Sequence, residues 1–432
     1  MEQFFQKVSN IVDSRQDELA SFVQRLVQIP SLPGEEQAAQ EFVAAKLHTL
    51  GLVVDVVRPC LEEVKDHPAF CDDGYPLDTR INIIGRWVGR QKGRSSGNEN
   101  AGSLILNGHI DVVPPGKEDL WEESPWSGTI KDRRLYGRGS CDMKAGLSSA
   151  IFAIEALIRL GFEPEHDILL ESVIGEETGG LGTLTTILKG YAADAAIILE
   201  PTSLALCPVQ AGALTFRLSV PGLSTHASMK TTGVSAIEKF YLLLHAIEEF
   251  ERRRHEHYQN PLYEHPQTVA PINIGTIKGG EWHSTVPNEL VVEGRYGVFP
   301  GESIAAAKKS FFETIMSVAQ HDPWLNQHPP ILEWFEGQFE PGETDVAQPI
   351  LRTLSAAHRQ VTGIDPKVRG VSYGSDLRLF TNHARIPAVL YGPGNVVHSH
   401  SANEFVSLLE VVMATKILAL AIYDWCGGEF AR

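Results

Sequence analysis

The sequence predicts an α/β fold of two domains, in which a smaller α+β domain is inserted into a larger one. Its 432 residues exceed the length of one ordinary domain. From about residue 80 to 200, short apolar runs alternate with segments of helical period, which is typical of a mostly parallel sheet flanked by helices. From residue 211 the order becomes strand, helix, strand, strand, helix, strand, which is the ferredoxin-like arrangement.

The elements of the larger domain follow from apolar periodicity. One helix is indicated by an apolar face of Leu147, Ile151, Ile154 and Ile158. The stretch Gly89–Gly102 is rich in Gly, Ser and charge, so we expect a surface loop there. Strands are predicted at four runs: Ile81–Val88, Ser103–Ile110, Asp167–Ile174 and Ala195–Leu199.

The inserted domain is predicted to span residues 211–337, between the two parts of the larger domain, 1–210 and 338–432. Its four strands are expected at Ala213–Val220, Val269–Ile277, Leu290–Tyr296 and Pro330–Phe335. Its two helix faces are expected to be Val234, Ile237, Tyr241 and Leu244, and then Ile304, Phe311, Ile315 and Val318. The larger domain then resumes with helices at Ala347–Val361 and Asn403–Cys426 and an apolar run at Ile386–Tyr391.

Composition excludes several kinds of partner. The net charge of −17 repels phosphate backbones, so we expect no nucleic-acid partner. The N-terminal sequence does not resemble a secretory signal, and no run approaches the roughly 18 apolar residues of a membrane span. The five cysteines are scattered and form no CxxC pair, which favours the reducing cytoplasm.

Five polar segments stand out, and four of them follow predicted strands. Each alone is a weak signal, because a His-x-Asp or Glu-Glu pair is common in solvated loops. Ligands in an open α/β sheet bind beyond the carboxyl ends of the strands, where four of these segments fall, and the fifth opens a helix beside them. The segments are Asn107–Asp111, Gly137–Lys144, Gly175–Gly179, Glu200-Pro201 and His398–Glu404.

These segments supply imidazole and carboxylate donors to one edge of the sheet. Zinc prefers mixed nitrogen and oxygen ligands, whereas an all-oxygen set would favour magnesium or calcium. Two ions about 3.5–4 Å apart can together polarise a carbonyl and activate a water. A further carboxylate must then take the proton from the water and pass it to a departing amine.

The combined motifs resemble the di-zinc amidohydrolase and exopeptidase family of acetylornithine deacetylase, succinyl-diaminopimelate desuccinylase, aminoacylase and carboxypeptidase G (peptidase family M20). The resemblance extends from Gln28-Ile29-Pro30-Ser31 to His400-Ser401-Ala402-Asn403-Glu404, nearly the whole chain. It implies two divalent ions, with Zn²⁺ as the first choice and Co²⁺ or Mn²⁺ as alternatives.

The resemblance also implies a role for each matching residue. Glu176 would be the general base, and Asp111 would orient His109 through its second ring nitrogen. The implied metal ligands are His109 and Glu200 for one ion, Glu177 and His400 for the other, and Asp142 as the bridge.

The inserted domain carries one further matching residue, His226 in Gly222–Ser228. In the family this histidine reaches the scissile carbonyl, often across a dimer, and would stabilise an oxyanion. The alternative is a turn histidine that caps the following helix. The family's inserted domains also form the dimer interface, so the resemblance implies a homodimer through this lid domain.

Two positions depart from the family pattern of substrate recognition. Ser284 stands where many relatives have Asn, and Gly297 stands where many have an Arg that binds a substrate carboxylate. Arg295 and Arg378, the latter in the Gly374–Arg378 loop, are the remaining candidates for anion binding. A surface arginine paired with an acid is the alternative for either.

We therefore expect a hydrolase that cleaves the amide bond of a small N-acylated amino acid or amine. Gly279–Pro287 looks most like the acetylornithine deacetylase branch, which includes a formylaminopyrimidine deformylase, so N-formyl and N-acetyl substrates come first. The alternatives are a metallo-dipeptidase or carboxypeptidase and an N-carbamoyl amidohydrolase on the same site. A non-catalytic binding protein is disfavoured, because the base and all five ligands are present.

Overall fold

The computed structural model describes residues 2–90 and 102–430, so most of the predicted loop Gly89–Gly102 lies outside the described residues. The chain divides into two compact units. The first unit contains Met1–Pro208, Glu343–Arg369 and Ser375–Arg432, and the second contains Val209–Gly342 and Gly370–Gly374. Residues 370–374 therefore group with the second unit, although the sequence pattern placed them in the larger domain.

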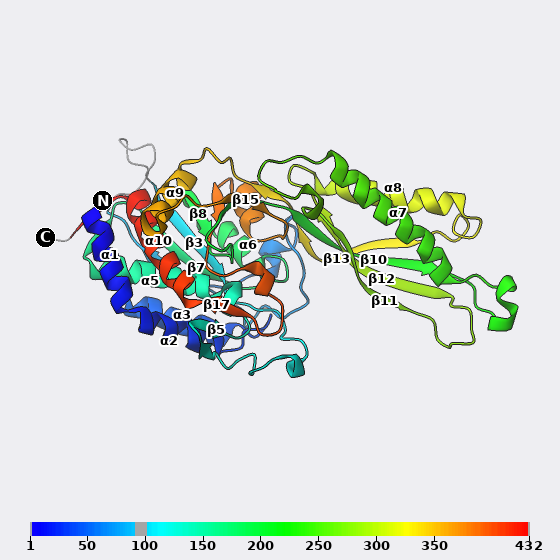
Figure 1. The fold of residues 1–432 in the computed structure, drawn as a ribbon, viewed down its shortest axis with the longest axis horizontal. Coiled ribbons are helices and arrows are strands. Elements are labelled where there is room, and N and C mark those ends of the chain that lie inside the picture. The colour runs from blue at the N-terminus through cyan, green and yellow to red at the C-terminus, as the bar shows by residue number, and fades with distance from the viewer. Residues whose placement is uncertain (1, 91–101, 431–432) are drawn as a thin grey trace. The chain divides into compact units, whose positions relative to one another are not determined.

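A nine-stranded sheet forms the centre of the first unit (Figure 1). The strands run in the order β1-β2-β7-β3-β8-β16-β9-β14, and β15 pairs with β9. The pairs β7–β3, β3–β8 and β8–β16 are parallel, whereas β1–β2, β2–β7 and β16–β9 are antiparallel. The strands are β1 Val53–Val57, β2 Asn82–Trp87, β3 Leu104–His109, β7 Ile168–Val173, β8 Ala195–Ile198, β9 Leu206–Gln210, β14 Gly342–Glu343, β15 Val368–Val371 and β16 Ala388–Leu390.

Helices cover this sheet, and every residue of β3, β7 and β8 is buried. Strands covered on both faces consist of nearly continuous apolar runs, which is why these segments are not alternating in sequence. The helices of the first unit are α1 Glu2–Ser14, α2 Gln16–Val27, α3 Gln37–Thr49, α4 Leu61–Val64, α5 Ala145–Arg159, α6 Leu181–Leu188, α9 Pro349–Thr362 and α10 Leu408–Cys426. Two small sheets join β4 Ile130–Lys131, β5 Arg134–Tyr136 and β17 Phe405–Ser407, and β6 Phe162–Pro164 with β18 Gly428–Phe430.

The start of α5 lies against the end of β8 because of a glycine. A Cβ atom on Gly146 would stand 2.0 Å from the carbonyl oxygen of Leu199. Only glycine permits this close approach of backbone to backbone. As a result, the segment before α5 and the segment after β8, which carry Asp142 and Glu200, start from neighbouring positions.

The second unit is a four-stranded antiparallel sheet with two helices. The strand order is β11-β12-β10-β13, which is the ferredoxin-like order, so the predicted fold class is confirmed for both parts of the chain. Phe216, Tyr296 and Phe311 are central to its apolar core. The elements are β10 Gly212–Pro221, α7 Ala236–His257, β11 Ile272–Gly279, β12 Glu289–Val298, α8 Ile304–His321 and β13 Ile331–Phe339.

The predicted apolar face of α7 is wrong. The helix buries Ala236, Phe240, Leu243 and Ile247, while the side chains of Ile237 and Tyr241 are 54% and 60% exposed. Both sets recur at helical spacing, so apolar periodicity alone could not choose between them. Among the described residues, no helix has the length and apolar content needed to cross a membrane.

Candidate active site and metal centre

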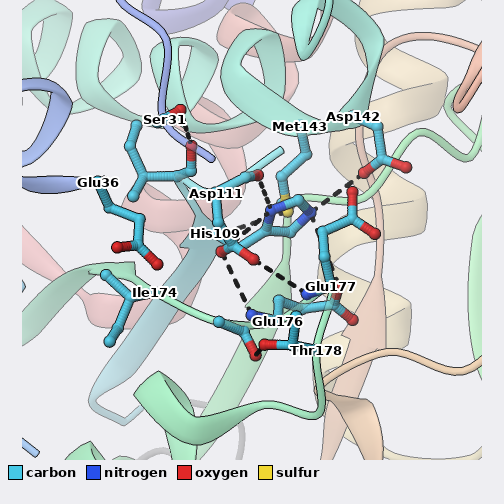
Figure 2. A network of polar contacts seen from close by, with 12 residues as sticks. Ser31, Glu36, His109, Asp111, Asp142, Met143, Ile174, Glu176, Glu177 and Thr178 are labelled. Carbon is cyan, nitrogen blue, oxygen red and sulfur yellow. Dashed lines mark hydrogen bonds and ion pairs between the residues drawn. The ribbon is translucent and has the colours of Figure 1, made fainter. Parts of the chain in front are cut away.

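His109 is the centre of the candidate site and ends strand β3 (Figure 2). Its side chain is 1% exposed. Nε2 lies 3.1 Å from Oδ1 of Asp142, and Nδ1 lies 2.8 Å from the backbone carbonyl oxygen of Asp111. The contact at Nδ1 fixes the ring so that Nε2 points to the carboxylates.

Two further acids, which follow the neighbouring strands β7 and β8, approach His109. Oε2 of Glu176 lies 4.0 Å from Nε2 of His109. One potential ligand atom from each of His109, Glu176 and Glu200 lies within 4.8 Å of the others, and all three side chains are buried. We call these three residues the inner group.

Asp142, Glu177 and His400 form a second set of donors, which also approaches His109. Nε2 of His400 lies 3.1 Å from Glu177 and 3.6 Å from Oδ2 of Asp142. The ligand atoms of Asp142, Glu177 and His109 are again within 4.8 Å of one another. We call Asp142, Glu177 and His400 the outer group, because the His400 side chain is 53% exposed.

The Asp111 carboxylate has a different contact from the one expected. Its oxygens accept hydrogen bonds from the backbone N–H groups of Glu176, at 3.2 Å, and Glu177, at 3.0 Å. The carboxylate stays 3.7 Å from Nδ1 of His109, whose hydrogen bond goes to the Asp111 backbone instead. Asp111 thus connects His109 to the Glu176-Glu177 turn. Its backbone carbonyl contacts the imidazole ring, and its carboxylate accepts the N–H groups of the turn.

Burial and the charges of neighbouring residues shift the pKa values of the acids in the cluster. Burial, together with the charge of Glu200, raises the pKa of Glu176 well above its usual value. Burial and the charge of Asp142 do the same for the pKa of Glu200. Burial alone would raise the pKa of Asp142, but the hydrogen bond from His109 and the charge of His400 hold it below its usual value. The pKa of His400 is raised to about 9 because its hydrogen bond and charge attraction with Glu177 outweigh burial.

This donor set fits divalent cations. Excess negative charge is gathered in a buried place, which is unfavourable unless protons or cations neutralise it. The donors are imidazole nitrogens and carboxylate oxygens, the set that zinc and related ions bind. In the metal-free cluster, protons must supply the missing positive charge, as the raised pKa values of Glu176 and His400 indicate.

Glu404 holds the outer group together, and the sequence analysis assigned it no role although it lies in a quoted motif. The side chain is fully buried. Oε1 accepts hydrogen bonds from the backbone N–H groups of Cys141, at 2.9 Å, and Asp142, at 3.1 Å, and Oε2 pairs with Arg138. The segment that carries His400 is thereby fixed to the backbone of Asp142.

Lys144 is a second residue that the sequence analysis missed. Its buried Nζ donates to the carbonyl oxygens of Leu26, in the last turn of α2, at 3.1 Å, and of Ile29, just after α2, at 2.8 Å. Burial lowers its pKa to about 7. The side chain joins the segment before α5 to the N-terminal helices and does not point to the acids.

Arg378, a candidate for substrate binding, is fully buried. Its Nη2 donates to the backbone carbonyl oxygen of Gly179, at 2.7 Å. The guanidinium therefore supports the end of the Glu176-Glu177 turn. Its burial rules out the alternative of a surface arginine.

The remaining predicted residues lie in the second unit. His226 lies in a turn, where Nδ1 accepts a hydrogen bond from the backbone N–H of Ser228 at 3.2 Å, so the capping alternative is realised. The backbone carbonyl of Ser284 accepts from Ala227 N–H at 2.9 Å. Arg295 is half-buried on β12 and donates to the carbonyl oxygen of Ser372 at 3.0 Å.

Gly297 is a position where no side chain fits. A Cβ atom there would stand 2.4 Å from the backbone carbon of Ala270. The Arg that many relatives have at the matching position is excluded here by the approach of this neighbouring backbone.

A buried cluster of imidazoles and carboxylates at the carboxyl edge of an α/β sheet is the site of a metal-dependent hydrolase. The model of Peptidase family M20/M25/M40 matches residues 105–424. The chain belongs to this family and is a metal-dependent amide hydrolase.

Two relatives share most of their length with this chain. N-formyl-4-amino-5-aminomethyl-2-methylpyrimidine deformylase from Halalkalibacterium halodurans is 31% identical, with 96% of each chain aligned. The enzyme of the same name from Bacillus subtilis is 29% identical, with 99% of each chain aligned. Among solved structures, human carnosine dipeptidase 1 matches with a TM-score of 0.73 at 18% identity, over 97% of this chain and 98% of that one, and shares the fold.

Proposed function

We propose that this enzyme removes a formyl or other small acyl group from the nitrogen of a small amine, with Glu176 as the general acid and base. The observation that carries this proposal is the position of Glu176, a buried carboxylate 4.0 Å from Nε2 of His109. The names of the two deformylase relatives describe the hydrolysis of a formamide, which is the same class of reaction.

In this proposal, two ions are held by the inner and outer groups. His109 and Glu200 would hold one ion and Glu177 and His400 the other. Asp142 would be shared by both, since its oxygens face His109 and His400. When bound, the ions would polarise the scissile carbonyl and make a water more acidic. We infer Zn²⁺ as the physiological ion because two imidazoles accompany the carboxylates.

Glu176 is suited to carry a proton from the attacking water to the departing amine. Its burial and its acidic neighbours raise its pKa, which makes it a stronger base than an exposed glutamate. Asp111 holds its backbone N–H group, so the turn presents the carboxylate from a fixed backbone. Glu176 can then return the proton to the leaving nitrogen.

The substrate is proposed to lack a carboxylate. The position of the usual arginine is closed by backbone at Gly297, and Arg378 is committed to Gly179. Arg295 remains the candidate for an anionic substituent, with one N–H bonded to Ser372. A neutral aminopyrimidine formamide therefore fits better than an N-acyl amino acid.

We further propose a cytoplasmic homodimer formed through the second unit. The five cysteines are scattered along the sequence and form no CxxC pair, which suits a reducing compartment. The exposed Ile237 and Tyr241 on α7 supply an apolar face for a two-fold contact. His226 keeps Nε2 for an oxyanion, because its hydrogen bonds with Ser228 are made at Nδ1.

The proposal is tested with purified protein loaded with zinc, cobalt or manganese. The substrates are an N-formyl aminomethylpyrimidine, N-formyl and N-acetyl amino acids, N-carbamoyl compounds and dipeptides. The kcat/KM value is expected to be highest for the formamide without a carboxylate. Faster hydrolysis of dipeptides or N-carbamoyl compounds would replace this proposal by one of the two alternatives, and light scattering on the same samples tests the dimer.

A further inference from the structure

A buried ion cluster lies against the turn that carries Glu176 and Glu177. Its members are Glu36, Asp73 and Arg80, with side chains 0%, 4% and 0% exposed. Nη1 of Arg80 lies 2.6 Å from Oδ2 of Asp73. Nε and Nη2 of Arg80 donate to Oε1 of Glu36, at 3.1 and 2.6 Å. None of these three residues belongs to a metal-ligand motif.

The cluster contacts the turn at two points. The hydroxyl of Thr178, the residue after Glu177, donates to Oδ2 of Asp73 at 2.8 Å. At the start of the turn, Gly175 has a φ of 64°, and a Cβ atom on it would stand 2.8 Å from Nη2 of Arg80. The guanidinium therefore lies directly against the backbone that precedes Glu176.

The turn is consequently held by two acids. Asp111 accepts the N–H groups of Glu176 and Glu177, and Asp73 accepts the hydroxyl of Thr178. Figure 2 shows Thr178 in the same turn as Glu176 and Glu177. Both acids act on the same short segment, although one precedes the turn by 65 residues and the other by 105.

Stability is a poor explanation for this cluster. A buried ion pair is often no more stabilising than apolar residues of the same volume, because both charges lose their hydration. What an ion cluster offers is directionality, since each hydrogen bond has a fixed length and angle. The second carboxylate oxygen of Asp73 is also used, because it accepts the backbone N–H of Tyr75 at 3.2 Å, so the acid cannot rotate freely.

We propose that Asp73 and Thr178, held by Arg80 and Glu36, are positioning residues for Glu176 and Glu177. This inference rests on the proposed role of Glu176 as the base. Loss of the Thr178 hydroxyl removes the hydrogen bond from the turn to Asp73, while the bonds to Asp111 and from Arg378 to Gly179 remain. The two carboxylates then sample a wider range of positions relative to His109 and His400.

The decisive variant is Thr178→Val, which keeps the shape of the side chain and removes the hydroxyl. Thr178→Ser restores the hydroxyl and is the rescue variant. Asp73→Asn is the second test, because it keeps an acceptor for Thr178 but removes the charge that holds Arg80. Thr185→Val is the matched control, since Thr185 is buried on α6 and its hydroxyl bonds only Leu181 O within the same helix, at 2.8 Å.

We expect kcat to fall roughly 10- to 100-fold in Thr178→Val with KM nearly unchanged, because misplaced catalytic groups slow the chemical step. Thr178→Ser should recover most of kcat, Asp73→Asn should resemble Thr178→Val, and Thr185→Val should match the wild type. Metal content, measured by mass spectrometry, should stay at the wild-type value in all four variants. The visible spectrum of the cobalt-loaded protein should shift in Thr178→Val and Asp73→Asn and remain unchanged in Thr185→Val, since Glu177 lies in the turn.

The inference is overturned if kcat is at the wild-type level in Thr178→Val, or if Thr178→Ser is as slow as Thr178→Val. An unshifted cobalt spectrum, or an equal loss of kcat in Thr185→Val, also overturns it. The spectra need no turnover. If the wild type hydrolyses none of the tested amides, the proposed function fails while the spectra still decide whether Asp73 and Thr178 position the turn.

Discussion

The two histidines of the candidate site occupy very different surroundings. His109 is 1% exposed, ends a central strand and is fixed through the Asp111 backbone. His400 is 53% exposed and lies on a loop in a left-handed conformation, with a φ of 57°. His109 is thus held by the sheet, whereas His400 depends on a loop. The difference indicates a buried, firmly held half of the site at His109 and a water-accessible half at His400.

The largest expected effects come from substituting Glu176 and Glu177. The two residues are adjacent in sequence but belong to different groups, so their loss should have different results. Glu176→Gln should lower kcat by about 10²- to 10⁴-fold, the range for loss of a general base. Both metal ions should remain bound, because the inner and outer ligands are intact. Glu177→Gln should instead lose the outer ion.

Kinetic assays and metal analysis on both variants make this comparison. If Glu176→Gln kept the wild-type kcat, Glu176 would not be the general base. Retention of both ions in Glu177→Gln would show that the outer group is not a separate site.

The next effect concerns metal release. With excess chelator, the wild type should release its ions in two phases, the faster from the outer group, because water reaches His400 but not His109. His400→Ala should abolish the fast phase and leave the slow one. A colorimetric chelator assay measures both, and a single phase in the wild type would contradict the division into two halves.

Asp111→Asn should have a smaller effect than Glu176→Gln. The amide keeps one acceptor oxygen, so one of the two N–H groups of the turn loses its partner. We expect kcat to fall about tenfold, which is about 1.4 kcal/mol, with His109 still held by the backbone carbonyl. Equal losses in Asp111→Asn and His109→Ala would mean that the carboxylate orients the ring after all.

The smallest expected effect is a pH dependence of the folding stability of the metal-free protein. The pKa of His400 is about 9 in the folded chain, above the ordinary value of about 6.5. The His400–Glu177 pair therefore stabilises the fold fully below about pH 6.5, and this contribution is lost as the pH rises through about 9.

Because His400 is half exposed, solvent screening keeps the contribution below about 1 kcal/mol. The difference in melting temperature between the metal-free wild type and His400→Gln should shrink from pH 6.5 to pH 9, measured by calorimetry. A difference that grows over this range would contradict the sign.

Much of this arrangement could be predicted from local sequence pattern. The buried strands of the first unit are apolar runs, and the five polar segments follow from the rule that ligands gather at the carboxyl edge of the sheet. The ferredoxin-like order of the second unit also follows from element order. Local pattern failed on α7. The apolar residues that include Phe240 and those that include Tyr241 both recur at helical spacing, and only packing against the sheet determines which set is buried.

Long-range contacts could not be predicted from the sequence. Glu404 meets Asp142 across 262 residues, and Arg80 meets Glu36 across 44, with no spacing rule to reveal either pair. Arg378 was expected at the rim of the site because its loop matched a motif, but a motif does not say which way a side chain points. The burial of a charged residue can be predicted from sequence only when its partner is known.

The position of Glu404 also has a consequence for the order in which the enzyme is made. During synthesis, strand β16 at Ala388–Leu390 is among the last elements to appear, yet it lies between β8 and β9 in the middle of the sheet. His400 and the Glu404 carboxylate that fixes Asp142 emerge later still. A nascent chain that has reached residue 387 thus has Glu176 and every inner ligand but no outer histidine. Hydrolytic competence is therefore delayed until residues 400–404 have been synthesised.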